Sequence, residues 1–187
     1  MPSLPRPAIF LDRDGTLIED QHYLKTPDQV VFIKGCEAAL RSLAINGWDL
    51  FLVTNQSGVG RGYFTMDDVT AVHDHIERHL ALKEVRFRAI YVAPEAPGQP
   101  SYGRKPEPGF LLQAAKEFGT PLSHSYMIGD KEADVLCGLR AGVRQSVLVR
   151  TGKGLETEKA MLAKGTPCLI VNSVVDAAIT ILNAQQS

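Results

Sequence analysis

Short apolar runs alternate with segments of helical periodicity along the chain. The runs are typical of buried strands, and apolar residues spaced three and four apart predict amphipathic helices. Because the strands are continuously apolar, we expect an α/β fold with a doubly wound, Rossmann-like parallel sheet between two helical layers. The predicted strands are 8–11, 49–55, 87–92, 125–130, 146–150 and 168–172, and the predicted helices are 35–44, 66–80, 108–118, 158–163 and 174–182.

Two long segments between these elements show no clear period. Residues 19–33 mix charged, aromatic and turn residues, which predicts a loop over the end of the first strand. Residues 94–108 contain five prolines, which preclude a regular element. Since no internal repeat or linker divides the chain, we expect one domain over residues 1–187.

Composition narrows the functional classes. With 187 residues, 44% of them hydrophobic, the chain can bury the core of one domain. A net charge of -1 without long runs of like charge argues against a nucleic-acid or membrane partner. The three cysteines are odd in number and widely spaced, and residues 1–7 lack the apolar segment of a signal peptide. We therefore expect a cytoplasmic protein with reduced thiols, acting as a monomer.

Polar side chains end three of the predicted strands. Asp12 and Asp14 follow the first strand, Thr54 and Asn55 end the second, and Asp130 ends the fourth. In open parallel sheets, ligands bind beyond the carboxyl ends of the strands. The alternative is that these are ordinary turn residues. In that case, all five would lie at the same edge of the sheet by chance. The pattern therefore favours a functional site.

The two acids after the first strand indicate the chemistry. If the backbone stays extended through Arg13, Asp12 and Asp14 point to one side and need a cation between them. Oxygen ligands without nearby Cys or His favour Mg²⁺ over zinc or copper. One carboxylate is then available for covalent attack and the other for proton transfer. Together with Lys105 and the Thr54 hydroxyl, these groups fit a phosphoryl-transfer site.

Four ordered segments carry a family resemblance: 12–16 (DRDGT), 54–58 (TNQSG), 104–106 (RKP) and 129–134 (GDKEAD). They resemble the motifs of the haloacid dehalogenase (HAD) phosphatases. Within that superfamily, the chain is similar over nearly its whole length to the heptose 1,7-bisphosphate phosphatases and the related histidinol-phosphatase domains. The resemblance implies a HAD-like fold without a large cap domain. It also implies a Mg²⁺-dependent phosphomonoesterase with an aspartyl-phosphate intermediate, acting on a small sugar phosphate in heptose and lipopolysaccharide biosynthesis.

The resemblance also implies residue roles. Asp12 matches the nucleophile and a magnesium ligand, and Asp14 matches the acid/base, whose backbone carbonyl also binds the metal. Asp130 matches the third protein ligand, and Thr54 and Lys105 match groups that stabilise the phosphate. The remaining matches are the substrate contacts Asp20, Gln21, His22, Tyr23, Thr54, Asn55, Gln56, Ser57, Arg104, Lys105 and Lys131, and a supporting acid beside the metal ligands, Asp134.

One loop departs from the family pattern. Members usually carry a zinc-bound loop of three Cys and one His just before Arg-Lys-Pro. Ala93, Glu95, Ser101 and Gly103 stand at these positions, and residues 93–104 contain no Cys or His. We therefore expect no zinc, and a loop held by its prolines. Because this loop shapes the pocket, heptose bisphosphate is the leading substrate, with histidinol phosphate or another small phosphate ester as the alternative.

Three further segments give weaker indications of function. Arg61, in a glycine-rich segment, either reaches a second anionic group of the substrate or belongs to a plain flexible turn. His73, His75 and His79 fall on one predicted helix, where we interpret them as a solvated face and not as a metal site. Residues 153–164 are interpreted as ordinary helix surface.

Two other functions use the same fold. A phosphatase acting on nucleic-acid 3′ ends is disfavoured because the chain has no basic surface. A non-catalytic module that binds phosphosugars or proteins would be expected to lack at least one of Asp12, Asp14, Lys105 and Asp130. All four are present, which favours the enzyme.

Overall fold

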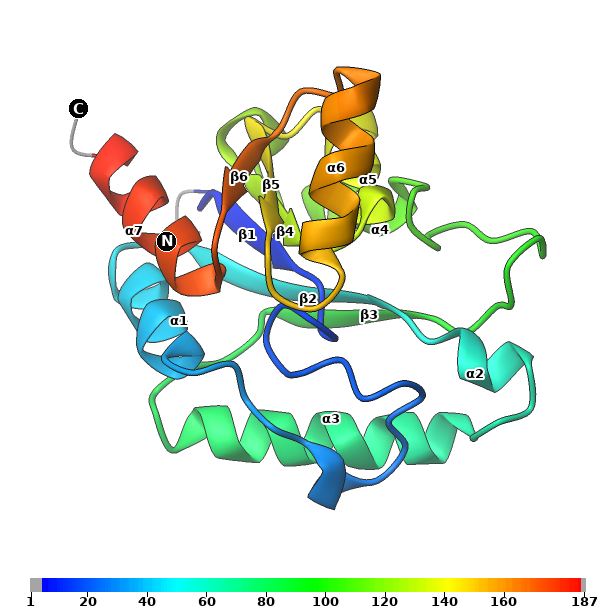
Figure 1. The fold of residues 1–187 in the computed structure, drawn as a ribbon. Helices are drawn as coiled ribbons and strands as arrows, with labels where there is room; N and C mark the ends of the chain where they lie inside the picture. Colours follow the sequence, from blue (N-terminus) through cyan, green and yellow to red (C-terminus); the bar gives the residue numbers. More distant parts are fainter. Residues whose placement is uncertain (1–4, 186–187) are drawn as a thin grey trace.

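A computed structural model of the protein describes residues 5–185. Its core is a six-stranded sheet in the order β3-β2-β1-β4-β5-β6, in which all neighbouring strands run parallel (Figure 1). This confirms the predicted α/β fold with a doubly wound parallel sheet. The strands are β1 (Ala8–Leu11), β2 (Asp49–Asn55), β3 (Ala89–Ala93), β4 (Tyr126–Gly129), β5 (Gln145–Val149) and β6 (Leu169–Val171).

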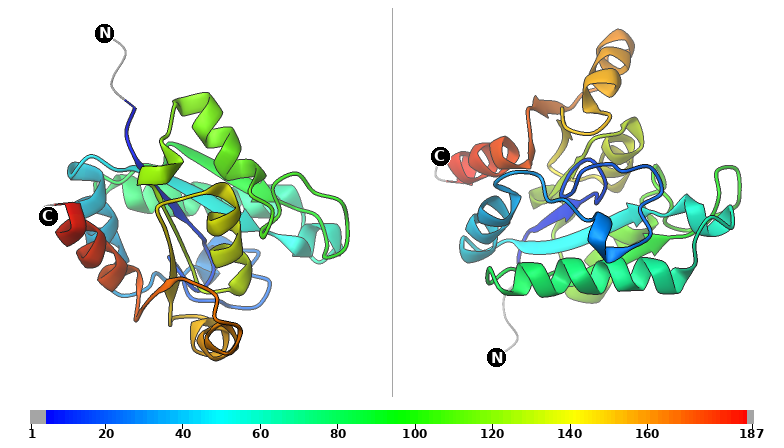
Figure 2. Two further views of the ribbon diagram at one scale, coloured as in Figure 1. Left: turned by 90° about the horizontal axis from the view of Figure 1, so that it is seen from above. Right: turned by 60° about the horizontal axis from the view of Figure 1, so that its bottom comes forward.

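Helices cover both faces of this sheet (Figure 2). One core cluster joins α1, α3 and α7 to the sheet, and a second joins α4 and α5 to its other face. The helices are α1 (Cys36–Ile45), α2 (Ser57–Gly60), α3 (Met66–Ala81), α4 (Gly109–Phe118), α5 (Glu132–Ala141), α6 (Gly154–Lys164) and α7 (Val174–Gln185), with 3₁₀ helices η1 (Pro27–Gln29) and η2 (Leu122–His124).

Strand β1 explains the continuously apolar pattern. Ile9 and Leu11 belong to the first core cluster, and Ala8 and Phe10 belong to the second. Successive side chains of a strand point to opposite faces, so a strand covered on both faces must be apolar at every position. All four residues of β1 are fully buried, which places the acids that follow it at the end of a rigid element.

The long connections contain no second folded body. Residues 12–35 contain η1 and residues 94–108 contain no helix or strand, so the described part of the chain has no cap domain. No helix within residues 5–185 is both long and apolar enough to cross a membrane. Residues 1–4, part of the segment in which we expect no signal peptide, lie outside the described range.

Three helices differ from the prediction. The short helix α2 lies in the glycine-rich segment, for which no helix was predicted. Helix α5 was not delimited, because its first turn is acidic and was interpreted as part of the polar end of β4. Helix α6 begins at Gly154, four residues earlier than expected. A Cβ atom at Gly154 would lie 1.7 Å from the Val149 carbonyl oxygen, so a glycine is needed where the helix starts against β5.

The carboxyl ends of β1 and β4 meet at the centre of the sheet. The Asp12 amide donates to the Ile128 carbonyl at 2.9 Å, which fixes Asp12 beside Asp130 at the end of β4. Chain connections leave β1 and β4 in opposite directions, and this is where ligands bind in doubly wound folds. The loop of residues 12–35 leaves from this edge and is tied to itself by paired backbone bonds between residues 17–19 and 31–33.

Candidate active site

The chain turns immediately after Asp12. The Arg13 carbonyl accepts hydrogen bonds from the amides of Leu17 and Ile18 at 2.9 and 3.2 Å, so the chain turns over residues 13–18. Asp12 and Asp14 contact different partners: Asp12 accepts from Lys105, and Asp14 accepts from Arg13. That the two carboxylates point to one side stays a prediction. The turn depends on Gly15, which has a φ of +80°.

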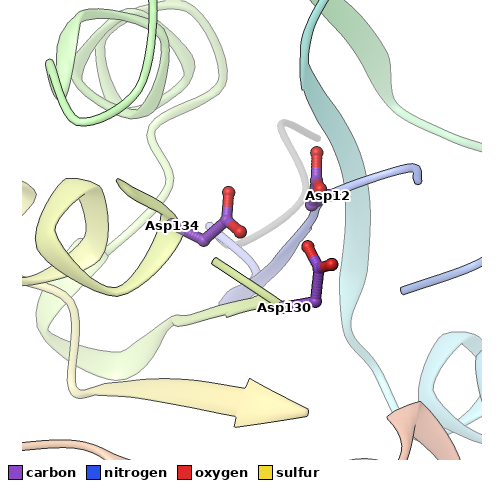
Figure 3. Close-up of side chains that lie close together, drawn as sticks. All are labelled: Asp12, Asp130 and Asp134. Carbon is purple, nitrogen blue, oxygen red and sulfur yellow. The ribbon is translucent and has the colours of Figure 1, made fainter. Parts of the chain in front are cut away.

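Three buried carboxylates converge at the ends of β1 and β4 and in the first turn of α5 (Figure 3). Asp12, Asp130 and Asp134 each offer one oxygen atom, and these atoms all lie within 4.8 Å of one another. The Lys105 ammonium lies 2.6 Å from both Asp12 Oδ1 and Asp134 Oδ1. It also donates to the Val53 carbonyl at 2.7 Å, so its buried charge is fully bonded.

The electrostatics of this cluster are unbalanced. Burial disfavours the charged form of Asp12, but the charges of Lys105 and Lys131 outweigh it and lower the pKa of Asp12. Burial, together with the negative charge of Asp12, raises the pKa of Asp130 to about 7. Burial disfavours the charged form of Lys105, but the negative charges of Asp12 and Asp134 outweigh this effect and raise its pKa above the usual value. Burial also raises the pKa of Asp134, although Lys105 opposes this rise. Lys105 contacts only two of the three acids, so negative charge in the cluster is left uncompensated.

A divalent cation fits this arrangement. Asp130 Oδ1 is buried and has no hydrogen-bond partner among the described residues. Its other oxygen, Oδ2, accepts the Lys153 amide at 2.8 Å. Lys131 Nζ is 3.7 Å from Oδ1, and its side chain is 42% exposed, so it compensates the charge only in part. The donor set consists of oxygen atoms, which suits Mg²⁺.

Asp14 is held by three donors. Arg13 donates to its two oxygens through Nε and Nη2, each at 3.1 Å. The Gln56 amide donates to Asp14 Oδ2 at 3.0 Å and to the Thr54 hydroxyl oxygen at 2.8 Å. Arg13 is 1% exposed, and this residue was not identified from the sequence as part of the site.

Of the three α3 histidines that we interpreted as a solvated face, His73 is buried, whereas His75 and His79 are partly exposed. His73 is 5% exposed and its Nε2 lies 3.2 Å from Arg13 Nη1. His79 stacks on Phe32 with ring centroids 4.3 Å apart and lies 3.1 Å from Glu37. The interpretation was wrong for His73 because the residue that contacts it, Arg13, is far away in sequence.

The Arg-Lys-Pro segment is docked on the end of β2. Asn55 donates to the Lys105 carbonyl at 2.9 Å and accepts the Lys105 amide at 3.0 Å. Two of the four positions that replace the zinc ligands bind Arg104: the Glu95 carbonyl accepts from its guanidinium at 2.8 Å, and the Ser101 hydroxyl accepts its amide at 2.9 Å. The loop is thus held by these hydrogen bonds in addition to its prolines.

A cleft of about 260 Å³ is lined by residues that include Asp14, Asn55 and Lys131. Lys131 Nζ pairs with Asp20 Oδ2 at 3.4 Å and so links the loop of residues 12–35 to the end of β4. The predicted residues that are not among those lining the cleft are Asp12, Gln21, Thr54, Arg61, Arg104, Lys105, Asp130 and Asp134. The predicted residues that do line it are Asp14, Asp20, His22, Tyr23, Asn55, Gln56, Ser57 and Lys131, joined by Arg13, Leu24, Gly58, Phe64 and Lys153.

Lys153 was missed by the sequence analysis, which assigned it to helix surface. It lines the cleft, and its amide holds Asp130. A signal was available, because Lys153 follows β5 and the carboxyl end of β5 lies at the same edge of the sheet as those of β1 and β4.

The chain is similar to known phosphatases along most of its length. A family described as HAD-hydrolase-like matches residues 102–177. The chain is 42% identical to the D-glycero-beta-D-manno-heptose-1,7-bisphosphate 7-phosphatase of Haemophilus influenzae, over 90% of this chain and 93% of that protein. It is 37% identical to the enzyme of the same name from Escherichia coli K12, over 96% of each chain.

Comparison of the fold with solved structures identifies the same group of proteins. The crystal structure of a D,D-heptose 1,7-bisphosphate phosphatase from B. bronchiseptica, in complex with magnesium and phosphate, matches with a TM-score of 0.87. The two chains are 31% identical, and the match covers 97% of this chain and 99% of the other. The chain therefore belongs to the D-glycero-beta-D-manno-heptose-1,7-bisphosphate 7-phosphatase family of HAD-like hydrolases.

Proposed function

We propose that this protein removes the 7-phosphate from D-glycero-D-manno-heptose 1,7-bisphosphate in a Mg²⁺-dependent reaction through an aspartyl-phosphate intermediate. The observation that carries the proposal is the buried cluster of Asp12, Asp130, Asp134 and Lys105 in a chain so similar to enzymes of that name. One domain, residues 1–187, carries the whole reaction, and the enzyme acts as a cytoplasmic monomer in heptose biosynthesis.

The metal ligands are the side chains of Asp12 and Asp130 and the backbone carbonyl of Asp14. Asp134 is less suited, because its two oxygens already accept from Lys105 Nζ at 2.6 Å and from the Lys131 amide at 2.9 Å. Asp130 Oδ1 has no such partner within residues 5–185. When bound, Mg²⁺ supplies positive charge that offsets the phosphate oxygens and the carboxylates around it.

Asp12 is the nucleophile. Its lowered pKa keeps it anionic, which is the form that attacks phosphorus. Lys105 donates a hydrogen bond to Asp12 Oδ1. Its positive charge also stabilises the negative charge of the phosphate. The Thr54 hydroxyl, fixed by Gln56, donates to a phosphate oxygen. These groups reduce the repulsion between the carboxylate and the phosphate dianion that would otherwise prevent attack.

Asp14 moves the protons. It lines the cleft, and Gln56 connects its carboxylate to the Thr54 hydroxyl. It first donates a proton to the leaving oxygen of the sugar and then takes one from the water that hydrolyses the aspartyl phosphate. The donors from Arg13 and Gln56 keep the carboxylate at one orientation through both steps.

The cleft accommodates a small phosphorylated sugar. Its wall includes Asp20, His22 and Tyr23 of the loop and the start of α2, and Lys131 adds a cation. Arg61 and Arg104 lie close enough for the charge of Arg61 to add to burial in lowering the pKa of Arg104. We propose that this pair of guanidinium groups, which lies outside the cleft lining, binds the second phosphate of a bisphosphate, and that Gln21 also contacts the substrate.

A phosphate-release screen tests the proposal. Heptose 1,7-bisphosphate, histidinol phosphate and hexose bisphosphates are compared at equal Mg²⁺ concentration. We expect heptose 1,7-bisphosphate to give the highest kcat/KM. A higher kcat/KM for histidinol phosphate would transfer the assignment to that substrate, and no release from any ester would favour a binding module.

A further inference from the structure

Arg13 is the largest fully buried side chain in the described part of the protein, and it is charged. A buried guanidinium is tolerated only when its donors find acceptors. Nε and Nη2 donate to Asp14, and Nη1 faces His73 Nε2 at 3.2 Å from the side of α3. The plane of Arg13 is therefore fixed by Asp14 on one side and by His73 on the other.

This contact fixes the protonation state of His73. A guanidinium has donors and no acceptor, so His73 Nε2 must accept, and the ring must be neutral with its proton on Nδ1. Burial, with a contribution from the charge of Arg13, lowers the pKa of His73 to about 3. The imidazole therefore remains an acceptor throughout the neutral and mildly acidic range.

We propose that His73 is a positioning residue for Asp14. By accepting a hydrogen bond from Arg13, His73 holds the guanidinium in the plane in which both of its other donors reach the Asp14 carboxylate. The inference rests on the proposed role of Asp14 in proton transfer. His73 does not line the cleft, so it acts through Arg13 and not by touching substrate.

Loss of the acceptor has a predictable consequence for Arg13. Arg13 lines the cleft as well as contacting His73, so water in the cleft is the nearest alternative partner for Nη1. A guanidinium that turns toward this water breaks the paired donation to Asp14. Misplacing a catalytic group by about 1 Å lowers the rate by up to 100-fold. Because His73 itself does not line the cleft, we expect its loss to change the rate more than substrate binding.

Three variants on α3 separate positioning from packing. His73→Leu removes the acceptor, and His73→Gln places an amide oxygen near the position of Nε2. His75→Leu is the matched control, because it makes the same change two residues away at a partly exposed position. We expect His73→Leu to lower kcat by roughly tenfold to 100-fold with KM changed less than about twofold. His73→Gln is expected to recover most of kcat, and His75→Leu to retain wild-type kinetics.

Two kinetic results would overturn the proposal. In one, folded His73→Leu retains wild-type kcat; in the other, both His73 variants lose kcat equally, which is the mark of a packing role. Circular dichroism establishes that the variants are folded.

A measurement on the wild-type protein needs neither a variant nor turnover. In ¹⁵N-histidine NMR spectra we expect His73 in the neutral Nδ1–H tautomer from pH 8 to about pH 4.5. A protonated ring or the Nε2–H tautomer in this range would contradict the inference. Failure of the proposed function would instead be seen as wild-type protein that releases no phosphate while His73 keeps the expected tautomer.

Discussion

Replacing Lys105 with methionine tests whether one ammonium group balances the acid cluster. The side chains have similar length, so the change mainly removes a positive charge from between Asp12 and Asp134 and leaves the Val53 carbonyl without its donor. Breaking a buried ion pair by removing one partner costs about 3–5 kcal/mol. Because Lys105 serves two carboxylates, we expect a loss of about 4 kcal/mol in the free energy of unfolding and roughly 10 °C in Tm.

The loss should depend on pH in a defined direction. Without Lys105, the folded state holds Asp12 and Asp134 without their main cation, so their pKa values in the folded variant rise. A carboxyl group whose folded pKa is raised stabilises the folded state as the pH falls. The stability difference between the variant and the wild type is therefore expected to be largest near pH 7 and smaller near pH 5.

Urea unfolding with EDTA present, at pH 7 and pH 5, measures both effects. Lys116→Met is the matched control, because Lys116 is an exposed lysine on α4. Phosphate release at saturating Mg²⁺ should fall by about 10²–10³-fold in Lys105→Met, as when a donor to a developing charge is removed. The reasoning would be refuted by a Lys105→Met protein within about 1 kcal/mol of wild type at pH 7 with no pH dependence of the difference.

Three further predictions follow from particular contacts. His73 has a folded pKa of about 3 against an ordinary value of 6.5. Its contribution to the free energy of unfolding is therefore complete above pH 6.5 and is lost as the pH falls toward 3, by about 2 kcal/mol at pH 5. Urea unfolding of His73→Gln should lack this part of the acid dependence. The same dependence of unfolding free energy on pH in His73→Gln and wild type would argue against this prediction. Gly15→Ala adds a Cβ at φ +80°, 2.3 Å from Asp130 Oδ2. It should lose activity and more than about 2 kcal/mol of stability, whereas Gly165→Ala, with φ +65° and no atom within 4 Å, should lose only the backbone part, about 1 kcal/mol; equal losses in calorimetry would refute the close contact. Because residues 93–104 contain no Cys or His, metal analysis of purified protein should find no stoichiometric zinc, and one zinc per chain would show that the loop binds it by other ligands.

The strands and the catalytic edge could be predicted because both depend on short-range sequence pattern. An uninterrupted apolar run such as 8–11 has few alternatives to a buried parallel strand, and the topology rule then places Asp12 and Asp130 at one edge. Lys105 was included because a phosphoryl-transfer site needs a cation, and the family motif supports its role. Periodicity alone would not have placed it, since it lies in a loop and reaches the acids across the end of β2.

The remaining contacts depend on how distant segments pack. Arg13 and His73 are 60 residues apart in the sequence. An arginine between two aspartates is typical of an exposed position, so the sequence did not indicate that Arg13 is buried. Helical spacing correctly placed His73 on α3, but it could not say which segment covers that end of the helix. Likewise, no local pattern shows that Arg104 bonds to two of the positions at which other family members bind zinc.

The most direct test of the central claim is to detect the phosphoryl group on Asp12. Wild-type protein is mixed with heptose 1,7-bisphosphate and Mg²⁺, quenched in acid within one turnover, digested and analysed by mass spectrometry. The account predicts a phosphorylated peptide whose modification maps to Asp12, and a folded Asp12→Asn protein with neither this peptide nor phosphate release. Phosphate release by Asp12→Asn, or wild-type turnover without phosphate on Asp12, would contradict it.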